Sequence, residues 1–430
     1  MSRILIDGRF IGVGDSMTRY TLEILKGILM LDKQNEYTLL VRPQGVKIAE
    51  RFLQETRNKI QGYKQNPNSK QPNKLTPNSY NLNIEVLDIP HYSFAEQTKL
   101  LSWLNEKKFD LVHFTQFNHP IRYRGKFVVT IHDLTLIGHL HRMNFGKKLG
   151  FRIAMRSAIK KSAKILTVSQ TSKDDIVDYY KINPNKVEVI YLAVDPKYSN
   201  RIMNDKLRIK AFKKKYGISG DYILYTGMWK RHKNLLRMLK AFEQVQCQMS
   251  NVPPASRLRR AGKCQVVLVG KIDKDEPEVL SEINRINSAI SNFQFPISNE
   301  MSNKLTPNSY LPIVATGFID EEVLPLAYAG ALVYCIPSLS EGFGLPPLEA
   351  MACGTPVISS NISAMPEILG DAPLYFDPYN VDDIAKAMKR IIEDKNLRDQ
   401  LVNKGLEQVK KYSWKDTARK TLEVYKNTLS

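Results

Sequence analysis

The chain is poor in cysteine and contains no long apolar run. Four of its 430 residues are cysteine: Cys247, Cys264, Cys335 and Cys353. Their spacing matches neither a Cys-x-x-Cys zinc motif nor a disulfide framework. No run of about twenty apolar residues occurs, and the N-terminal MSRILIDGRF leads directly into an expected strand. We therefore predict no membrane span and no signal peptide, and expect a reduced, cytoplasmic protein.

Acidic residues are also scarce, because 43 of them face 63 basic residues and give a formal net charge of +20. None occurs between Leu134 and Ser172. In that stretch basic residues recur every four positions beside apolar residues at helical spacing: Lys148, Arg152, Arg156 and Lys160, with Phe145, Leu149, Ile153 and Ile159. The pattern fits an amphipathic helix on an anionic lipid surface at the inner face of the cell membrane. It fits equally a helix packed on its sheet with a solvated basic face.

The positive charge would also suit nucleic acid. However, no nucleic-acid motif and no interleaved set of aromatic residues accompanies it. We do not expect nucleic acid as a partner.

The length fits two domains rather than one core. Apolar strand-like runs alternate with helical stretches, which predicts the α/β class with two Rossmann-like, doubly wound parallel sheets. The expected strands of the first sheet are 4–7, 37–41, 84–89, 111–114, 127–132, 165–169 and 187–194, and those of the second are 222–227, 266–270, 313–318, 332–336, 357–360 and 374–376. Ligands bind outside the carboxyl ends of such strands, so we expect the reaction in a cleft between the domains.

We place the domain boundary between Asp195 and Asp221, with domains at 1–200 and 201–411. Three polar stretches are typical of mobile surface insertions, at about 60–83, 250–264 and 287–312. The octapeptide NKLTPNSY occurs at 73–80 and again at 303–310. A duplicated insertion explains it more simply than a binding role.

One stretch combines two carboxylates with a glycine-rich turn: PSLSEGFGLPPLEAMACGTPV, residues 337–357. The preceding run Ala331–Ile336 is apolar and of strand length, and two glycines open the turn after it. Leu345–Cys353 is rich in helix formers, with two prolines in its first turn and Gly354 after its end. Strand, glycine turn and helix together predict a helix N-terminus that can bind a diphosphate.

The two carboxylates, Glu341 and Glu349, are unsuited to contact phosphate because both are negatively charged. Carboxylate oxygens accept hydrogen bonds from paired hydroxyls instead. We expect Glu341 to hold a transferred sugar and Glu349 a nucleotide ribose. The alternative is a helix cap at Glu341 and a solvated side chain at Glu349. The residues between them complete the expected donor site: Gly342, Phe343, Gly344 and Leu345.

This region resembles the donor-binding half of the family 4 retaining glycosyltransferases (glycosyl transferases group 1), which have the GT-B fold. The resemblance rests on SEGFGLPPLEAMACGTPV and on PE at 366–367, GDA at 370–372 and YFDP at 375–378. Looser similarity covers ILIDGR at 4–9, TIHDL at 130–134, TVS at 167–169, YTG at 225–227 and YSW at 412–414. The resemblance implies two Rossmann-like domains facing across a cleft, and a final helix, 412–430, that crosses back to the first.

The resemblance also implies a metal-independent reaction. Asp273-Lys274-Asp275 imitates an Asp-x-Asp metal motif, but it lies in a loop, and we assign no metal there.

The donor phosphates require a cation, and a basic loop, KRHK, follows the strand that ends at Gly227. The family often has arginine directly after this glycine, whereas this chain has Met228. The resemblance implies that Lys233, with Arg231 or the lysine before it, neutralises the leaving diphosphate. The alternative is a loop that is merely solvated. Phe318, at the end of another expected strand, joins the donor set.

His132 follows an apolar run and should emerge at the carboxyl end of a strand. The resemblance implies that its imidazole hydrogen-bonds the donor sugar or the diphosphate, as a catalytic residue. A satisfied structural histidine is the alternative.

The first loop of the chain is rich in glycine, which lets the backbone approach a ligand. By resemblance this loop lies near the acceptor, so we expect acceptor contacts from Gly12, Gly14, Arg19 and Tyr20. Many relatives have glycine where this chain has Thr18, so the loop is expected to differ in shape.

Together these features predict a retaining glycosyltransferase that needs no cofactor. It would move a hexose, mannose or glucose, from a nucleoside diphosphate sugar to a lipid-linked or saccharide acceptor in cell-surface polysaccharide synthesis. Two alternatives remain open: a non-catalytic scaffold that binds nucleotide sugars, and a sugar-nucleotide epimerase with the same fold.

Overall fold

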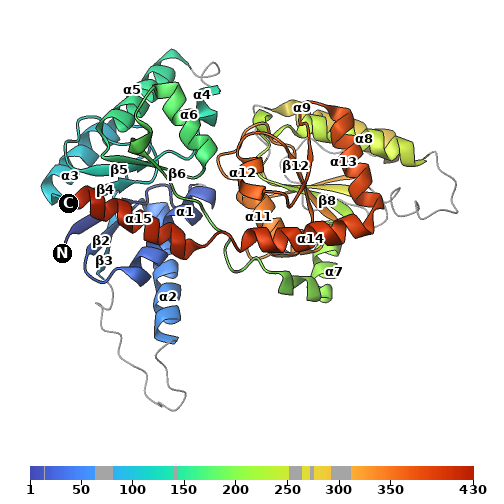
Figure 1. The fold of residues 1–430 in the computed structure, drawn as a ribbon, viewed down its shortest axis with the longest axis horizontal. Coiled ribbons are helices and arrows are strands. Elements are labelled where there is room, and N and C mark those ends of the chain that lie inside the picture. Colours follow the sequence, from blue (N-terminus) through green and yellow to red (C-terminus); the bar gives the residue numbers. More distant parts are fainter. Residues whose placement is uncertain (14, 63–80, 139–143, 251–263, 272–275, 292–310) are drawn as a thin grey trace, which may run out of the picture. The chain divides into compact units, whose positions relative to one another are not determined.

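The computed structural model describes the whole chain except residues 14, 63–80, 139–143, 251–263, 272–275 and 292–310 (Figure 1). Two compact units are present. The first comprises Met1–Leu192 and Ser413–Ser430, and the second Ala193–Tyr412. Most of each expected insertion, both octapeptide copies and the Asp273-Lys274-Asp275 motif lie outside the described residues.

The first unit is built on seven parallel strands in the order β3-β2-β1-β4-β5-β6-β7. The strands are β1 (Arg3–Asp7), β2 (Glu36–Val41), β3 (Leu82–Val86), β4 (Leu111–Phe114), β5 (Phe127–Thr130), β6 (Lys164–Thr167) and β7 (Val187–Val189). The interior strand β1 pairs Ile6 with Leu39 of β2 and with His113 of β4. Strands β4 and β5 are wholly buried, which explains why they are apolar except for His113 and Thr130.

The helices of the first unit connect these strands. They are α1 (Asp15–Leu31), α2 (Val46–Gly62), α3 (Leu101–Lys107), α4 (Thr135–Gly138), α5 (Phe145–Lys161), α6 (Gln170–Tyr180) and α15 (Trp414–Leu429). Short turns of helix are η1 (Pro43–Gly45), η2 (Glu96–Leu100) and η4 (Pro184–Lys186).

The C-terminal helix α15 packs against α1 within the first unit (Figure 1). Its Tyr425 hydroxyl lies 2.6 Å from Nδ1 of His113 on β4. Nε2 of His113 lies 2.8 Å from Thr130 Oγ1 on β5, and Thr130 Oγ1 lies 2.7 Å from the Tyr20 hydroxyl on α1. This buried chain of hydrogen bonds ties two strands to two helices.

The second unit has six parallel strands in the order β10-β9-β8-β11-β12-β13. They are β8 (Tyr222–Thr226), β9 (Gln265–Val269), β10 (Ile313–Gly317), β11 (Val333–Ile336), β12 (Val357–Ser360) and β13 (Leu374–Phe376). The predicted fold class, two doubly wound parallel sheets, is therefore confirmed. In both sheets the strand order reverses beside the first strand of the unit, which is where such folds bind ligands.

Helices cover the second sheet on both sides. They are α7 (Lys206–Lys215), α8 (Leu235–Ser250), α9 (Pro277–Ser291), α10 (Leu324–Ala329), α11 (Leu345–Ala352), α12 (Met365–Leu369), α13 (Val381–Glu393) and α14 (Lys395–Val409), with short turns η5 (Asn200–Asn204) and η6 (Arg231–Lys233). Helix α8 packs with α9 and α13, and α11 packs with α10 and α14. Helix α9 continues to Ser291 and so occupies the start of the third expected insertion.

No helix among the described residues is at once long and apolar enough to cross a lipid bilayer. Cys264, Cys335 and Cys353 are buried free thiols.

Candidate active site

The loops after β8 and β11 meet at the carboxyl edge of the second sheet. Asn234, between η6 and α8, has a left-handed backbone with φ of 59° and a buried side chain. Its amide donates to the carbonyls of Pro337 (3.0 Å) and Pro378 (2.8 Å). The Leu339 N–H donates to the His232 carbonyl at 2.7 Å. These bonds fix the basic loop against the glycine-rich loop.

Lys233 and Glu341 form an ion pair across this junction. Lys233 Nζ lies 2.6 Å from Glu341 Oε1, and the exposed fractions of the two side chains are 20% and 13%. The two residues were predicted separately, Lys233 for the leaving diphosphate and Glu341 for the sugar. The structure brings them together, with the cation and the carboxylate at one place.

Two serines that the sequence did not single out hold Glu341 in position. Ser338 Oγ donates to Glu341 Oε1 at 2.7 Å. Ser363, after β12, accepts from the Glu341 N–H (3.1 Å) and donates to the Glu341 carbonyl (3.0 Å). The spacing of Ser338 and Glu341 offered a weak local signal, but nothing in the sequence connects Ser363 with them.

Helix α11 begins directly after the glycine-rich loop, as predicted. Gly344 precedes its first residue, Leu345, with a left-handed φ of 81°. The left-handed φ favours glycine here, and a Cβ at Gly344 would lie 2.4 Å from the end of the Met365 side chain, which would have to move. Pro346 and Pro347 have no N–H, so Leu345 supplies the backbone donor of the first turn. At the other end, the Gly354 N–H donates to the Met351 carbonyl, as in a Schellman cap.

The interior of the glycine-rich loop is buried, including Gly342. The Phe343 ring is only 4% exposed and packs edge-on against Tyr412, with ring centroids 5.6 Å apart. Phe343 is thus an anchor for the loop, and any donor contact at this position would involve its backbone.

Glu349 is buried, at 2% exposure, and not the solvated helix residue of the alternative interpretation. The Tyr328 hydroxyl donates to its Oε2 at 2.9 Å. Tyr328 in turn contacts Thr226 Oγ1 at 2.8 Å, at the end of β8. Burial, with the Glu349 carboxylate beside it, raises the pKa of Tyr328 well above its ordinary value. No motif or spacing in the sequence pointed to Tyr328.

The ends of β8 and β9 approach each other through glycine. Gly227 has a φ of 137°, and a Cβ at Gly270 would lie 2.0 Å from the Gly227 carbonyl oxygen. No larger residue fits there. Beyond these glycines, Arg231, Met228 (46%) and Phe318 (62%) are solvent-exposed in the second unit.

His132 lies in the first unit, two residues past the end of β5. Its Nε2 donates to the Thr115 carbonyl at 3.3 Å, and its ring meets Tyr20 edge-on at 4.6 Å. Burial lowers the pKa of His132, and Asp133 offsets this only in part, so the ring is neutral at neutral pH. Because a carbonyl can only accept, Nε2 carries the proton and Nδ1 is left as an acceptor.

The expected acceptor loop has an internal support. The Gly12 N–H donates to Thr18 Oγ1 at 3.0 Å, so the threonine at this position fastens the glycine loop to α1. Arg19 is half-buried on α1, whereas Tyr20 is 3% exposed and hydrogen-bonded to Thr130. Gly14 lies outside the described residues.

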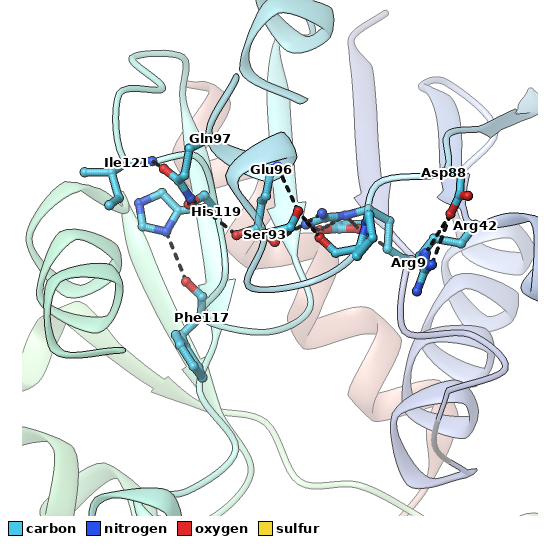
Figure 2. A network of polar contacts seen from close by, with 11 residues as sticks. Arg9, Arg42, Asp88, Ser93, Glu96, Gln97, Phe117, His119 and Ile121 are labelled. Carbon is cyan, nitrogen blue, oxygen red and sulfur yellow. Dashed lines mark hydrogen bonds and ion pairs between the residues drawn. The ribbon is translucent and has the colours of Figure 1, made fainter. Parts of the chain in front are cut away.

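The first unit also contains a buried network of ion pairs, to which the sequence analysis assigned no function. Arg9 is fully buried; its Nη2 lies 2.8 Å from Asp7 Oδ2 and its Nη1 3.2 Å from Glu96 Oε2. Figure 2 shows Arg9 pointing to Glu96, with the neighbouring Gln97 accepting from the Ile121 N–H at 2.8 Å. Burial would raise the pKa of Asp7, but Arg9 lowers it. The opposite charges of Asp7 and Arg9, two residues apart in the sequence, were the only local indication of this network.

Within the described part of the chain, no three His, Cys, Asp or Glu side chains cluster in a way that could hold a metal ion.

Both halves of the chain match known glycosyltransferase families. Residues 311–408 match glycosyl transferases group 1, and residues 65–198 match glycosyltransferase family 4. This chain is a family 4 glycosyltransferase. This family 4 glycosyltransferase is similar to the O-antigen chain mannosyltransferase B of Escherichia coli, with 27% identity over 75% of this chain and 76% of the relative. It is also similar to the serotype-specific mannosyltransferase WbdA of E. coli, with 27% identity over 71% of this chain but only 34% of WbdA, so it spans about a third of that relative.

Solved structures agree on the fold of this glycosyltransferase. HepE of Anabaena, in complex with UDP and glucose, superimposes with a TM-score of 0.69 at 15% identity, covering 99% of this chain and 100% of HepE. Sucrose-phosphate synthase of Thermosynechococcus elongatus gives a TM-score of 0.67 at 16% identity, covering 99% of each chain. The GT-B fold that the sequence predicted is confirmed.

Proposed function

We propose that this glycosyltransferase moves a hexose, with mannose or glucose favoured, from a nucleoside diphosphate sugar to a lipid-linked or saccharide acceptor in cell-surface polysaccharide synthesis. The observation that carries the proposal is the pair of Lys233 and Glu341 at the switch point of the second sheet, with Glu349 buried nearby on α11. A cation suits a diphosphate, and two carboxylates suit sugar and ribose hydroxyls. The mannosyltransferase relatives and the UDP and glucose complex of HepE favour the same substrate class.

In the proposed reaction the bond from the anomeric carbon to the diphosphate oxygen breaks as the acceptor oxygen attacks from the same face. Lys233, Arg231 and the Leu345 N–H stabilise the charge that develops on the leaving diphosphate. The proton of the acceptor hydroxyl passes to that leaving group. No metal is needed in this scheme, and the configuration of the sugar is retained.

Glu341 holds the transferred sugar, because Ser338 and Lys233 keep its carboxylate in place and Ser363 holds its backbone. Glu349 accepts from the ribose hydroxyls. His132 contacts the sugar rather than the phosphate, since its neutral Nδ1 can accept from a hydroxyl but cannot donate to a phosphate oxygen. Tyr20 positions His132 from behind, while Gly12 and Arg19 approach the acceptor.

We further propose a cytoplasmic protein held at the inner face of the cell membrane by the basic face of α5. The buried free thiols Cys264, Cys335 and Cys353 suit a reducing compartment. Lys148, Arg152, Arg156 and Lys160 supply attraction to anionic lipid.

The test is a panel of GDP-, UDP-, ADP- and dTDP-sugars, added without metal, with thermal shift and slow donor hydrolysis as the two measurements. We expect one donor to stabilise the protein and to be hydrolysed with release of the sugar. Stabilisation without hydrolysis, even with acceptor lipids added, would favour a scaffold, and isomerised nucleotide sugar would favour an epimerase. If no nucleotide sugar changes the melting temperature or is hydrolysed, the proposed donor site is wrong.

A further inference from the structure

Helix α5 presents two different faces. Phe151, Met155 and Ile159 are buried against the first sheet. Phe145, Leu149 and Ile153 are exposed, at 81%, 47% and 45%. We predicted that Ile159 belongs to the same apolar stripe as these three residues. That prediction is wrong, because Ile159 packs into the core of the first unit. The exposed apolar stripe covers about 12 Å along the helix axis.

Two neighbouring cavities open between α5, the C-terminal end of α6 and the residues after it. One has a volume of about 180 Å³ and is lined by Ile137, Phe151, Arg152, Arg156, Tyr179 and Tyr180. The other has about 480 Å³, shares Arg156 and Tyr180, and adds Lys160 and Lys186. The smaller cavity has room for several water molecules, which is enough space for a phosphate group.

Within the described part of the chain, no carboxylate forms an ion pair with the cations that line these cavities. Neither Arg152 nor Arg156 forms an ion pair with any residue that the structure describes. Helix α6 carries three carboxylates, at Asp174, Asp175 and Asp178, but none of them lines either cavity. Two guanidinium groups one turn apart, facing a space without carboxylates, are suited to a phosphate oxyanion.

Tyrosine adds neutral donors to the same space. Tyr179 and Tyr180 pack edge-on with ring centroids 4.9 Å apart. Burial raises the pKa of the Tyr180 hydroxyl to about 12, although Arg156 and Arg152 lower it somewhat, so the hydroxyl keeps its proton. It can therefore donate to a phosphate oxygen.

We propose that this cleft between α5 and α6, the arginine cleft, binds the phosphate of an anionic lipid headgroup. The exposed stripe of Phe145, Leu149 and Ile153 then enters the acyl boundary of the same membrane. Arg152 lies three residues after Leu149, and Arg156 lies three residues after Ile153, so each arginine neighbours a residue of the apolar stripe on the helix surface and headgroup and acyl contacts are made together. This proposal rests on the proposed membrane association and replaces diffuse attraction by a defined site.

The experiment compares full-length variants in flotation with phosphatidylcholine vesicles, with and without phosphatidylglycerol. The decisive variant, Arg152→Lys with Arg156→Lys, keeps the charge but removes the planar fork. We expect it to partition about tenfold more weakly than wild type, because a lysine makes no bidentate phosphate contact. The control, Lys147→Arg, changes an exposed position of the same helix outside both cavities and should bind as wild type does.

Equal binding of the Arg→Lys variant and wild type would overturn the site in favour of diffuse charge attraction. A second experiment measures thermal unfolding in the presence of glycerol phosphate, a soluble phosphate. If glycerol phosphate stabilises wild type but not the Arg→Lys variant, while flotation is unchanged, the cleft takes a soluble phosphate and the lipid assignment is wrong. Circular dichroism confirms that each variant is folded. The nucleotide-sugar panel, run without vesicles, tests the proposed function separately.

Discussion

Lys233 Nζ lies 2.6 Å from Glu341 Oε1 and joins the turn after β8 to the glycine-rich loop after β11. The pair is partly exposed, so its direct contribution to stability is small, about 1 kcal/mol or less. Its importance is positional. It holds a cation and a carboxylate within hydrogen-bonding distance of each other at the edge of the sheet where the donor is proposed to bind.

Replacing Glu341 by glutamine should reduce donor turnover by about 100-fold, which corresponds to about 2.7 kcal/mol of barrier. The amide cannot pair with Lys233 and accepts more weakly from sugar hydroxyls. The exposed Glu393 on α13, changed to glutamine, is the matched control and should turn over as wild type does. Turnover of Glu341→Gln within about threefold of wild type would remove the assigned role.

Changing Tyr328 to phenylalanine should lower the free energy of unfolding by about 1–3 kcal/mol, because the buried Glu349 carboxylate loses a donor. A less firmly held Glu349 should also raise the donor KM more than it lowers kcat. Denaturant unfolding and steady-state kinetics measure the two effects. Tyr379→Phe, at an exposed position, is the control. Unchanged stability and KM would show that Glu349 needs no support from Tyr328.

The first unit should lose stability as the pH falls below about 6.5. Burial lowers the pKa of His113 to about 3 and of His119 to about 4. Since the unfolded chain binds these protons first, the neutral histidines stabilise the fold above the unfolded value of about 6.5. That stability is lost as the pH falls toward 4, at about 1.4 kcal/mol per pH unit for each histidine.

Urea unfolding between pH 5 and 7 checks this slope. His119→Gln should reduce the slope of the unfolding free energy against pH by about 1.4 kcal/mol per pH unit, the share of one titrating histidine, although the variant is less stable at pH 7. An identical slope in wild type and His119→Gln would contradict the assignment.

Thr18→Val should loosen the loop that the Thr18 hydroxyl holds at Gly12. Loss of one hydrogen bond worth about 1 kcal/mol should speed exchange of the Gly12 amide by roughly fivefold. Hydrogen exchange read by mass spectrometry or NMR gives the measurement. Thr18→Ser keeps the hydroxyl and should restore slow exchange. Slow exchange in Thr18→Val would mean that the backbone alone orders this loop.

Flotation with anionic vesicles should weaken when the exposed stripe of α5 is made polar. Phe145→Gln with Leu149→Gln removes two apolar side chains, which each contribute on the order of 1.5–3 kcal/mol when fully buried in lipid. Partition should fall by at least tenfold. Met203→Gln, at an exposed position of the second unit, is the control. If both variants float as wild type does, α5 does not enter the membrane.

The sheets and the donor loop were predictable because their signals are local. Most of the expected strands are buried apolar runs, and all thirteen expected strands are present in the structure. The glycine turn, the prolines and Gly354 defined α11 for the same reason. Residues such as Ser363 and Tyr328 were not predictable, since they come from other loops and helices and only the fold carries them to Glu341 and Glu349.

The sequence by itself determined the two parallel sheets, the glycine-rich loop with its two carboxylates, and the basic character of α5, because periodicity, turn chemistry and charge are all written within a few residues. Tertiary structure decided that Lys233 pairs with Glu341, that Glu349 is buried against Tyr328, and that Ile159 faces the core while Ile153 faces solvent. These depend on distances between residues far apart in the chain, or on which side of a helix meets its sheet, and packing alone fixes both.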